Sequence, residues 1–206
     1  MARERSAGTV REGAKSARTR ERILLAAAQV LSRKGYAGTR LTDVAAVAEV
    51  QAPAVYYYWS SREELLEEVV TVGQRATMEH VVASLDALPD DTPAMERIAH
   101  AIAAHLEVVL GRSDFSQAAI RNAGQLPADI RERQLVGQRE YADVWRGLVE
   151  DAVAAGEMAP DVDTRAARML VLGALNWAPE WWDPERNSLE EVVATTQRIV
   201  RAGLRP

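Results

Sequence analysis

The chain has 206 residues, a net charge of −5 and no cysteine, with 48% hydrophobic and 27% charged residues. This composition is ordinary for a globular protein, and without cysteine the chain has no disulfides, thiolate metal sites or thiol redox chemistry. No window approaches the roughly 18 apolar residues of a membrane span, and the first residues lack the apolar core of a signal peptide. We therefore expect a cytoplasmic protein with no membrane partner.

Charge is distributed unevenly along the chain. Residues 1–64 carry 11 basic and 7 acidic side chains, whereas the remainder carries 14 basic and 23 acidic ones. A basic front and an acidic rear indicate that only the front meets a polyanion such as nucleic acid. Residues 1–17 are rich in Gly, Ser, Arg and Glu, and we interpret them as a flexible basic arm that either contacts DNA or is merely solvated.

The front half of the chain has helical periodicity. From Thr19, apolar residues recur at three-to-four spacing as far as Gly35, a natural residue to end a helix. Thr39 is a candidate N-cap for a short second helix, and Pro53 suits the first turn of a short third helix. A Ser-Ser pair with glutamates three residues on predicts the capped start of a long fourth helix that ends near Leu85.

The rear half continues the same pattern. Further helices are predicted at 94–110, 115–124, 128–156, 163–177 and 188–203. Pro179 disfavours helix at Ala178, so we expect the chain to leave the helix there. No stretch alternates apolar and polar residues as a strand does, and the predicted fold class is all-α.

Two short helices joined by a tight turn, behind a longer helix, form a helix-turn-helix unit whose second helix enters the DNA major groove. Val55 and Trp59 lie on one face and are predicted to pack in the core. Tyrosines on the opposite face can contact thymine methyls or sugars through the ring and phosphates through the hydroxyl. Tyr58 has two interpretations, as a packing residue or as a DNA contact.

A string of matched positions identifies a family resemblance. The positions are Ala28, Leu31, Gly35, Tyr36 and Thr39, the triplet Asp43-Val44-Ala45, Ala48 and Val50, and Tyr56-x-x-Trp59-x-Ser61-Arg62-Glu63-x-Leu65. Together they resemble the DNA-binding domain of the TetR family of transcriptional regulators. The turn of the family usually holds glycine where this chain has Glu49, which would cost about 1 kcal/mol in a left-handed conformation.

The resemblance implies an architecture and a set of partners. Residues 18–64 would form an N-terminal three-helix helix-turn-helix DNA-binding domain, and residues 65–206 a helical-bundle ligand-binding and dimerisation domain. The implied partners are double-stranded, partly palindromic operator DNA, a second copy in a homodimer, and a small-molecule effector. The segments IRNAGQLP, EYADVWR and LGALNW are loosely similar to TetR-type regulators of lipid and steroid catabolism that sense CoA thioesters.

Three groups of candidate site residues follow from the patterns and the resemblance. The predicted DNA contacts are Arg40, Thr42, Gln51, Ala52, Pro53, Ala54, Tyr56, Tyr57, Tyr58, Ser61 and Arg62. The predicted ligand-binding residues are His105, Arg121, Asn122, Gln125, Tyr141, Trp145 and Trp177. The predicted dimer contacts are Met169, Leu172, Gly173, Val192, Thr196 and Ile199.

Some interpretations stay open at the level of sequence. Trp177, Trp181 and Trp182 suit either an interface anchor or a pocket wall. Arg121 could bind a carboxylate or phosphate, or could simply lie on the surface. No metal-binding histidine spacing, phosphate loop or nucleophile motif is present, so we expect no metal, no cofactor and no enzyme activity.

The favoured function is a ligand-responsive repressor, released from its operator by a small hydrophobic or acyl-CoA-like effector. One alternative is a helix-turn-helix regulator with no small-molecule ligand. Another is an enzyme or carrier that uses a helical pocket.

Overall fold

The computed structural model describes residues 2–111, 114–122 and 124–206, and the described residues are helical with no strand, which confirms the all-α prediction. The helices are α1 (Ala2–Gly38), α2 (Leu41–Val47), α3 (Ala52–Tyr56), α4 (Arg62–Asp86), α5 (Ala94–Leu110), α6 (Asp114–Asn122), α7 (Ala128–Ala154), α8 (Thr164–Trp181) and α9 (Leu189–Leu204).

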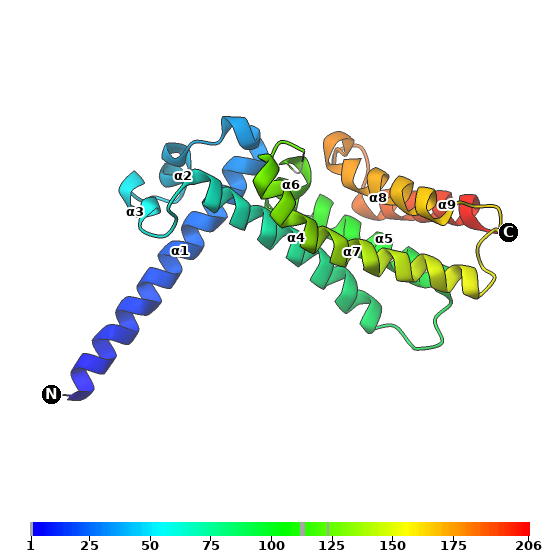
Figure 1. Cartoon of the computed structure of the whole chain (residues 1–206), viewed down its shortest axis with the longest axis horizontal. Coiled ribbons are helices and arrows are strands. Elements are labelled where there is room, and N and C mark those ends of the chain that lie inside the picture. Colours follow the sequence, from blue (N-terminus) through cyan, green and yellow to red (C-terminus); the bar gives the residue numbers. More distant parts are fainter. Residues whose placement is uncertain (1, 112–113, 123) are drawn as a thin grey trace.

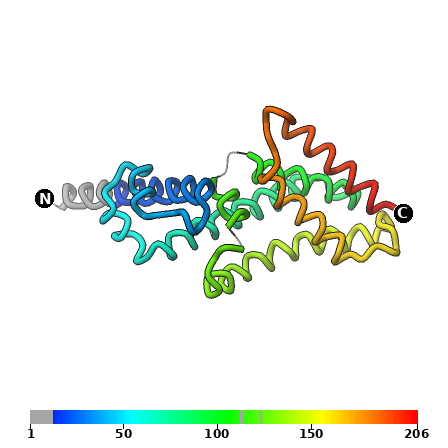
Figure 2. Tube along the Cα trace, turned by 90° about the horizontal axis from the view of Figure 1, so that it is seen from above, coloured from blue at the N-terminus to red at the C-terminus, as the bar shows by residue number. Residues whose placement is uncertain are grey.

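The molecule is elongated, with different helices at its two ends. Helix α1 leads from the N-terminus past α2 and α3 at one end, while α8, α9 and the C-terminus lie at the other (Figure 1). The view from above shows the same separation, with α4 running from one end towards the other (Figure 2). Among the described residues no helix is both long enough and apolar enough to cross a bilayer.

Two hydrophobic cores correspond to these two ends. The front core is built by α1 to α4 and also takes in Ala118 of α6 and Ile130 of α7. The rear core is built by α5, α7, α8 and α9. Helix α4 belongs to both, since Leu65 lies in the front core and Val81 in the rear core. Helix α4 is therefore one continuous helix that contributes Leu65 to the front core and Val81 to the rear core.

The helix boundaries differ from the sequence predictions at three places. Helix α1 begins at Ala2 rather than Thr19, even though Gly8 and Gly13 have low helical propensity. Gly35 has a φ of 69°, as expected of a helix-ending glycine. Thr39 is not the N-cap of α2; Arg40 is, and the Thr39 hydroxyl instead donates to the Gly35 carbonyl at 2.8 Å.

The third difference is Pro179, which lies inside α8 rather than ending it. Pro179 removes one backbone hydrogen bond of α8, and its ring crowds the carbonyl of Leu175, so the proline costs the helix stability. The Pro179 carbonyl, however, accepts a hydrogen bond of 2.7 Å from the Arg121 guanidinium of α6. This tertiary contact stabilises the last turn of α8.

Candidate DNA-binding and effector sites

The turn between α2 and α3 holds the two helices at a fixed angle. Val44, Ala48 and Val55 are buried in the front core. Glu49 has a φ of 53°, so this exposed glutamate takes the left-handed conformation that glycine adopts more easily. The strained turn is held by hydrogen bonds such as that from the Val50 amide to the Ala45 carbonyl, at 3.0 Å.

Helix α3 presents an exposed face to solvent. Tyr56 is 59% exposed and Tyr57 is 79% exposed, which is unusual for such large rings. Gln51 and Pro53 are also exposed at the start of the helix, and the Gln51 side chain forms no capping hydrogen bond. Of the other predicted contacts, Arg40 and Thr42 are exposed and Ala52 and Ala54 are half-buried.

Tyr58 and Trp59 point the other way and attach α1 to the helix-turn-helix unit. The Tyr58 hydroxyl lies 3.1 Å from both the hydroxyl and the carbonyl oxygen of Ser16. The Trp59 indole donates to Glu68 at 2.7 Å, and the same carboxylate pairs with Arg20, which stacks over the Trp59 ring. These contacts favour the packing interpretation of Tyr58.

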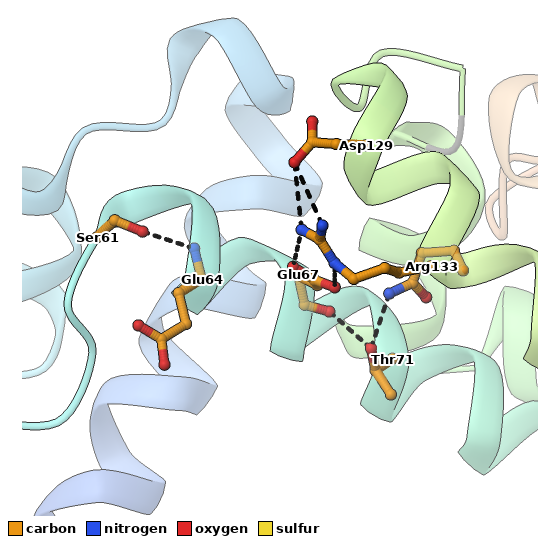
Figure 3. Close-up of polar contacts among 7 residues, drawn as sticks. Ser61, Glu64, Glu67, Thr71, Asp129 and Arg133 are labelled. Carbon is orange, nitrogen blue, oxygen red and sulfur yellow. Dashed lines mark hydrogen bonds and ion pairs between the residues drawn. The ribbon is translucent and has the colours of Figure 1, made fainter.

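The start of α4 is capped, and its first arginine faces inward. The Ser61 hydroxyl accepts a hydrogen bond of 3.1 Å from the Glu64 amide (Figure 3). The Arg62 guanidinium donates to the carbonyls of Thr39 and Tyr36 and stacks on the Tyr36 ring at 4.4 Å. Arg62 therefore joins α4 to the end of α1, and a DNA contact by Arg62 stays a prediction.

A polar joint connects α4 to α7 behind the DNA-binding unit. Arg133 donates two hydrogen bonds to Glu67, at 2.6 and 2.7 Å, and Asp129 lies beside it (Figure 3). The amide of Gln134, the next residue of α7, donates to the Thr71 hydroxyl at 2.9 Å. These contacts attach the start of α7 to α4, the helix that follows α3 in the chain.

The predicted ligand residues separate into two neighbouring groups. The first, which we call the aromatic cluster, comprises His105, Tyr141 and Trp145 between α5 and α7, with ring centroids 5.9 to 6.4 Å apart. The His105 Nδ1 lies 2.7 Å from the Tyr141 hydroxyl. Burial lowers the pKa of His105 to about 4, with the Asn176 side chain opposing the shift, so His105 is neutral at pH 7.

The aromatic cluster is incompletely hydrogen-bonded. Nε2 of His105 and Nε1 of Trp145 are buried and form no hydrogen bond of standard geometry among the described residues, although the Asn176 side chain lies near His105 and the Tyr141 side chain near Trp145. An unpaired buried group of this kind typically costs about 1–3 kcal/mol. The cluster could therefore gain stability from a ligand or water molecule that satisfies these nitrogens.

The second group lines an open cleft of about 600 Å³ at the junction of the two cores, which we call the junction cleft. Its walls come from the end of α1, from α6 with the segment after it, and from α8. The lining residues are Ser32, Arg33, Lys34, Gly35, Ile120, Arg121, Asn122, Gln125, Asn176, Trp177 and Glu180. Arg121, Asn122, Gln125 and Trp177 therefore line one cleft, while the Asn176 side chain lies between this cleft and His105.

Sequence reasoning missed the wall supplied by α1 and, apart from Trp177, the wall supplied by α8. The residues concerned are Arg33, Lys34, Asn176 and Glu180. The single available signal was Asn176, a polar residue inside the apolar run LVLGALNW. Nothing local to residues 32–35 indicates that they face a helix from the rear core.

An apolar groove of about 700 Å³ lies between α8 and α9, with Leu106 of α5 among its lining residues. Both helices pack on α5. Ile199 is 65% exposed and Trp177 64% exposed along this groove, and Trp181 is exposed there too. Among the predicted dimer contacts, Met169 and Gly173 are also exposed, Leu172 and Thr196 are half-buried, and Val192 is buried in the rear core.

The residues that the structure describes contain no cluster of three or more His, Asp or Glu side chains suited to a metal ion. The candidate sites are therefore the exposed face of α3, the polar junction cleft and the apolar groove. None of these arrangements assembles a nucleophile with a general base.

Two family models match separate parts of the chain. Residues 23–69 match the family model described as "Bacterial regulatory proteins, tetR family". Residues 91–204 match that described as "Tetracyclin repressor-like, C-terminal domain".

Whole-chain relatives are more distant in sequence. The Fatty acid metabolism regulator protein of Bacillus subtilis is 20% identical over 162 residues, which cover 78% of this chain and 81% of the relative. The repressor KstR2 of Mycolicibacterium smegmatis is 23% identical over 190 residues, 90% of each chain.

Solved structures share the fold. AibR in complex with isovaleryl coenzyme A and operator DNA aligns with a TM-score of 0.79 at 20% identity, covering 88% of this chain and 97% of AibR. At this identity the likeness concerns the fold, whereas the two family models together cover the DNA-binding unit and most of the rear core. The chain belongs to the TetR family of transcriptional regulators.

Proposed function

We propose that this protein is a dimeric, ligand-responsive repressor that leaves a partly palindromic operator when a small hydrophobic or acyl-CoA-like effector binds. The observation that carries the proposal is the position of the junction cleft. One wall is the end of α1, which belongs to the front core, and another is α8, which belongs to the rear core. A ligand there contacts both ends of the molecule at once.

The exposed face of α3 supports operator binding. Gln51 offers an amide that can pair with adenine, and the rings of Tyr56 and Tyr57 can contact thymine methyls or sugars. Few polar side chains lie on this face, so DNA shape would contribute to the choice of sequence.

The apolar groove between α8 and α9 supports dimer formation, which is also typical of the family. Exposed Met169, Trp181 and Ile199 form an apolar surface that a second copy would cover. A two-fold dimer presents two α3 helices, and so the operator would consist of two related half-sites.

Effector control follows from the connections between the two ends. Helix α4, the Arg133–Glu67 joint and the contacts of Arg121 carry a rear-core movement to the front core. A ligand that binds better to the arrangement with misaligned α3 helices shifts the population towards it. Ligand and operator must then weaken each other by the same factor.

An acyl-CoA-like effector fits the chemistry of the cleft and the neighbouring aromatic cluster. The cleft carries three basic side chains, whereas the aromatic cluster is apolar with a few unpaired nitrogens. AibR, which shares the fold, was solved with isovaleryl coenzyme A and operator DNA.

The test combines two measurements on the full chain. Thermal-shift assays would screen acyl-CoAs, steroids, fatty acids and aromatic compounds, and fluorescence anisotropy would follow binding to DNA upstream of the gene at two salt concentrations. We expect steeply salt-dependent DNA binding that a stabilising compound weakens. DNA binding that no stabilising compound alters would contradict the effector part, and salt-insensitive or absent DNA binding would contradict the whole proposal.

A further inference from the structure

Basic side chains outnumber acidic ones in the junction cleft. The cleft is lined by Arg33, Lys34 and Arg121, whereas Glu180 is the one carboxylate among the lining residues that the structure describes. Lys34 is already paired with Asp43 outside the lining, at 2.9 Å. Arg33 is exposed and has no ion pair within the described part of the chain, so its charge is available to a ligand.

A buried hydrogen-bond acceptor also faces this cleft. Asn122 is fully buried, and its amide nitrogen donates to the Ala118 carbonyl at 2.9 Å and to the Leu31 carbonyl at 3.4 Å. Its Oδ1 has no hydrogen-bond partner among the described residues and lies 3.7 Å from the position that a Cβ on Gly35 would take. A ligand in the cleft that carries an N–H or O–H group would satisfy this oxygen.

Arg121 is held by contacts that an anion could replace. Its guanidinium pairs with Glu180 at 2.8 Å and donates to the carbonyls of Pro179 and Ser32. The ion pair is about one-third exposed on both sides, so it is only weakly favourable on its own. A phosphate would form stronger, bidentate hydrogen bonds with the same guanidinium.

We propose that the junction cleft binds a phosphate-bearing ligand, such as a nucleotide, that also offers an N–H or O–H donor. Its phosphate pairs with Arg33 and Arg121, and its donor satisfies Asn122. Binding displaces Glu180 from Arg121 and so releases α8 from its ion pair with α6. The release of the operator by this exchange rests on the proposed function, whereas ligand binding itself is measured without DNA.

The experiment is isothermal titration calorimetry of the full chain with adenosine 3′,5′-bisphosphate, with adenosine and inorganic pyrophosphate as partial probes. We expect the bisphosphate to bind most tightly, pyrophosphate more weakly and adenosine weakest. Arg33→Gln and Arg121→Gln should each weaken bisphosphate binding about tenfold, because each removes a charge-assisted contact. Glu180→Gln should tighten it, because it removes the competing carboxylate.

Arg146→Gln is the matched control, since Arg146 pairs with Asp143 and Glu150 on its own helix, away from the cleft. This variant should bind the bisphosphate as the unaltered chain does. The proposal is overturned if the bisphosphate does not bind, or if neither Arg33→Gln nor Glu180→Gln changes its affinity. Pyrophosphate binding as tight as the bisphosphate would show that the nucleoside part adds nothing to binding.

Measurements with operator DNA then distinguish ligand binding at the cleft from its effect on DNA binding. If the bisphosphate binds as expected and weakens operator binding, both the site and its regulatory role are supported. If it binds without changing operator affinity, the site stands and the exchange does not control DNA binding. Absence of operator binding in every condition would contradict the proposed function and leave the calorimetric result intact.

Discussion

Gly73 of α4 lies directly against the backbone of Phe115 in α6. A Cβ on Gly73 would meet the Phe115 carbonyl oxygen at 2.2 Å, closer than a carbon and an oxygen can approach. Beside this contact the Thr77 hydroxyl donates to the Gly73 carbonyl at 2.9 Å and lies 3.1 Å from the Ser116 hydroxyl. The close crossing of α4 and α6 therefore requires glycine at position 73. The crossing also places α6 against α1.

Gly73→Ala should destabilise the protein, because the backbone of α6 must move to accept the added methyl group. We expect a loss of about 1–3 kcal/mol in the free energy of unfolding, measured by urea denaturation. Gly147→Ala in α7 is the matched control, since nothing lies within 4 Å of its added Cβ. That variant should gain about 0.5–1 kcal/mol from helical propensity. Equal effects of the two variants would contradict the close crossing.

Glu49→Gly should stabilise the chain. Glu49 has a φ of 53°, where a side chain costs roughly 1–2 kcal/mol and glycine costs nothing. The greater freedom of glycine in the unfolded chain offsets part of this gain, so we expect a net increase of about 0.5–1 kcal/mol in the free energy of unfolding. Glu49→Ala keeps the strain and should gain nothing in the same thermal and urea measurements. A loss on substitution by glycine would show that the glutamate side chain stabilises the turn.

His105 should make stability depend on pH. Its pKa is about 4 in the folded protein, below the ordinary 6.5, because burial disfavours the charged ring. The unfolded chain therefore binds the proton more readily, and the stabilisation is fully present above pH 6.5 and is lost as the pH falls towards 4. Between pH 7 and pH 5 we expect the free energy of unfolding to fall by about 2 kcal/mol because of His105.

Urea denaturation of His105→Gln at the two pH values checks this prediction. The variant should lose much of the pH dependence, even though its stability at pH 7 falls because the Tyr141 hydroxyl changes partner. The control is His100→Gln, which replaces an exposed histidine and should keep the pH dependence of the unaltered chain. An unchanged slope in His105→Gln would contradict the low pKa.

The sequence was sufficient to predict features that depend on local patterns. Helical periodicity gave the class of fold, and the spacing from Ala28 to Leu65 gave the helix-turn-helix unit with Val55 and Trp59 inside. The left-handed turn at Glu49 followed from the glycine that the family has there. Periodicity also placed His105, Tyr141 and Trp145 on inward faces of their helices, where they meet.

What the sequence did not predict depends on contacts between distant helices. The junction cleft forms because α6 crosses α4 at Gly73. This crossing brings Arg121 of α6 to the carbonyl of Ser32, which lies 89 residues earlier in the chain. No local pattern encodes that crossing. Pro179 lies within α8, where its carbonyl accepts a hydrogen bond from Arg121 of α6. Arg62 points inward, where its guanidinium donates to the carbonyls of Tyr36 and Thr39 at the end of α1.

Ile199→Arg should weaken dimer formation. Ile199 is 65% exposed on α9 and lines the apolar groove that we propose is covered by a second copy. A buried, unpaired arginine at the centre of such an interface should raise the dimer dissociation constant by more than about tenfold. Sedimentation equilibrium measures this constant. Val136→Arg, at a similarly exposed site on α7, should leave it unchanged, and equal behaviour of both variants would place the interface elsewhere.

Tyr56→Ala should weaken operator binding without destabilising the protein. The Tyr56 ring is 59% exposed on the proposed reading face of α3, so its removal leaves no cavity in the front core. Loss of its contacts with thymine methyls, sugars or a phosphate should cost about 1–3 kcal/mol of binding free energy, a tenfold to hundredfold rise in the operator dissociation constant. Anisotropy titrations with the operator and with unrelated DNA measure the loss.

Two further variants divide the contribution of Tyr56 into its parts. Tyr56→Phe removes just the hydroxyl, so it should reduce the salt dependence of binding if that hydroxyl contacts a phosphate. Val136→Ala alters an equally exposed apolar residue on α7, outside the helix-turn-helix unit, and should bind DNA normally. If Tyr56→Ala bound the operator as well as the unaltered chain does, the exposed tyrosines of α3 would not read DNA, and the reading face would have to be sought at Arg40, Thr42 and Gln51.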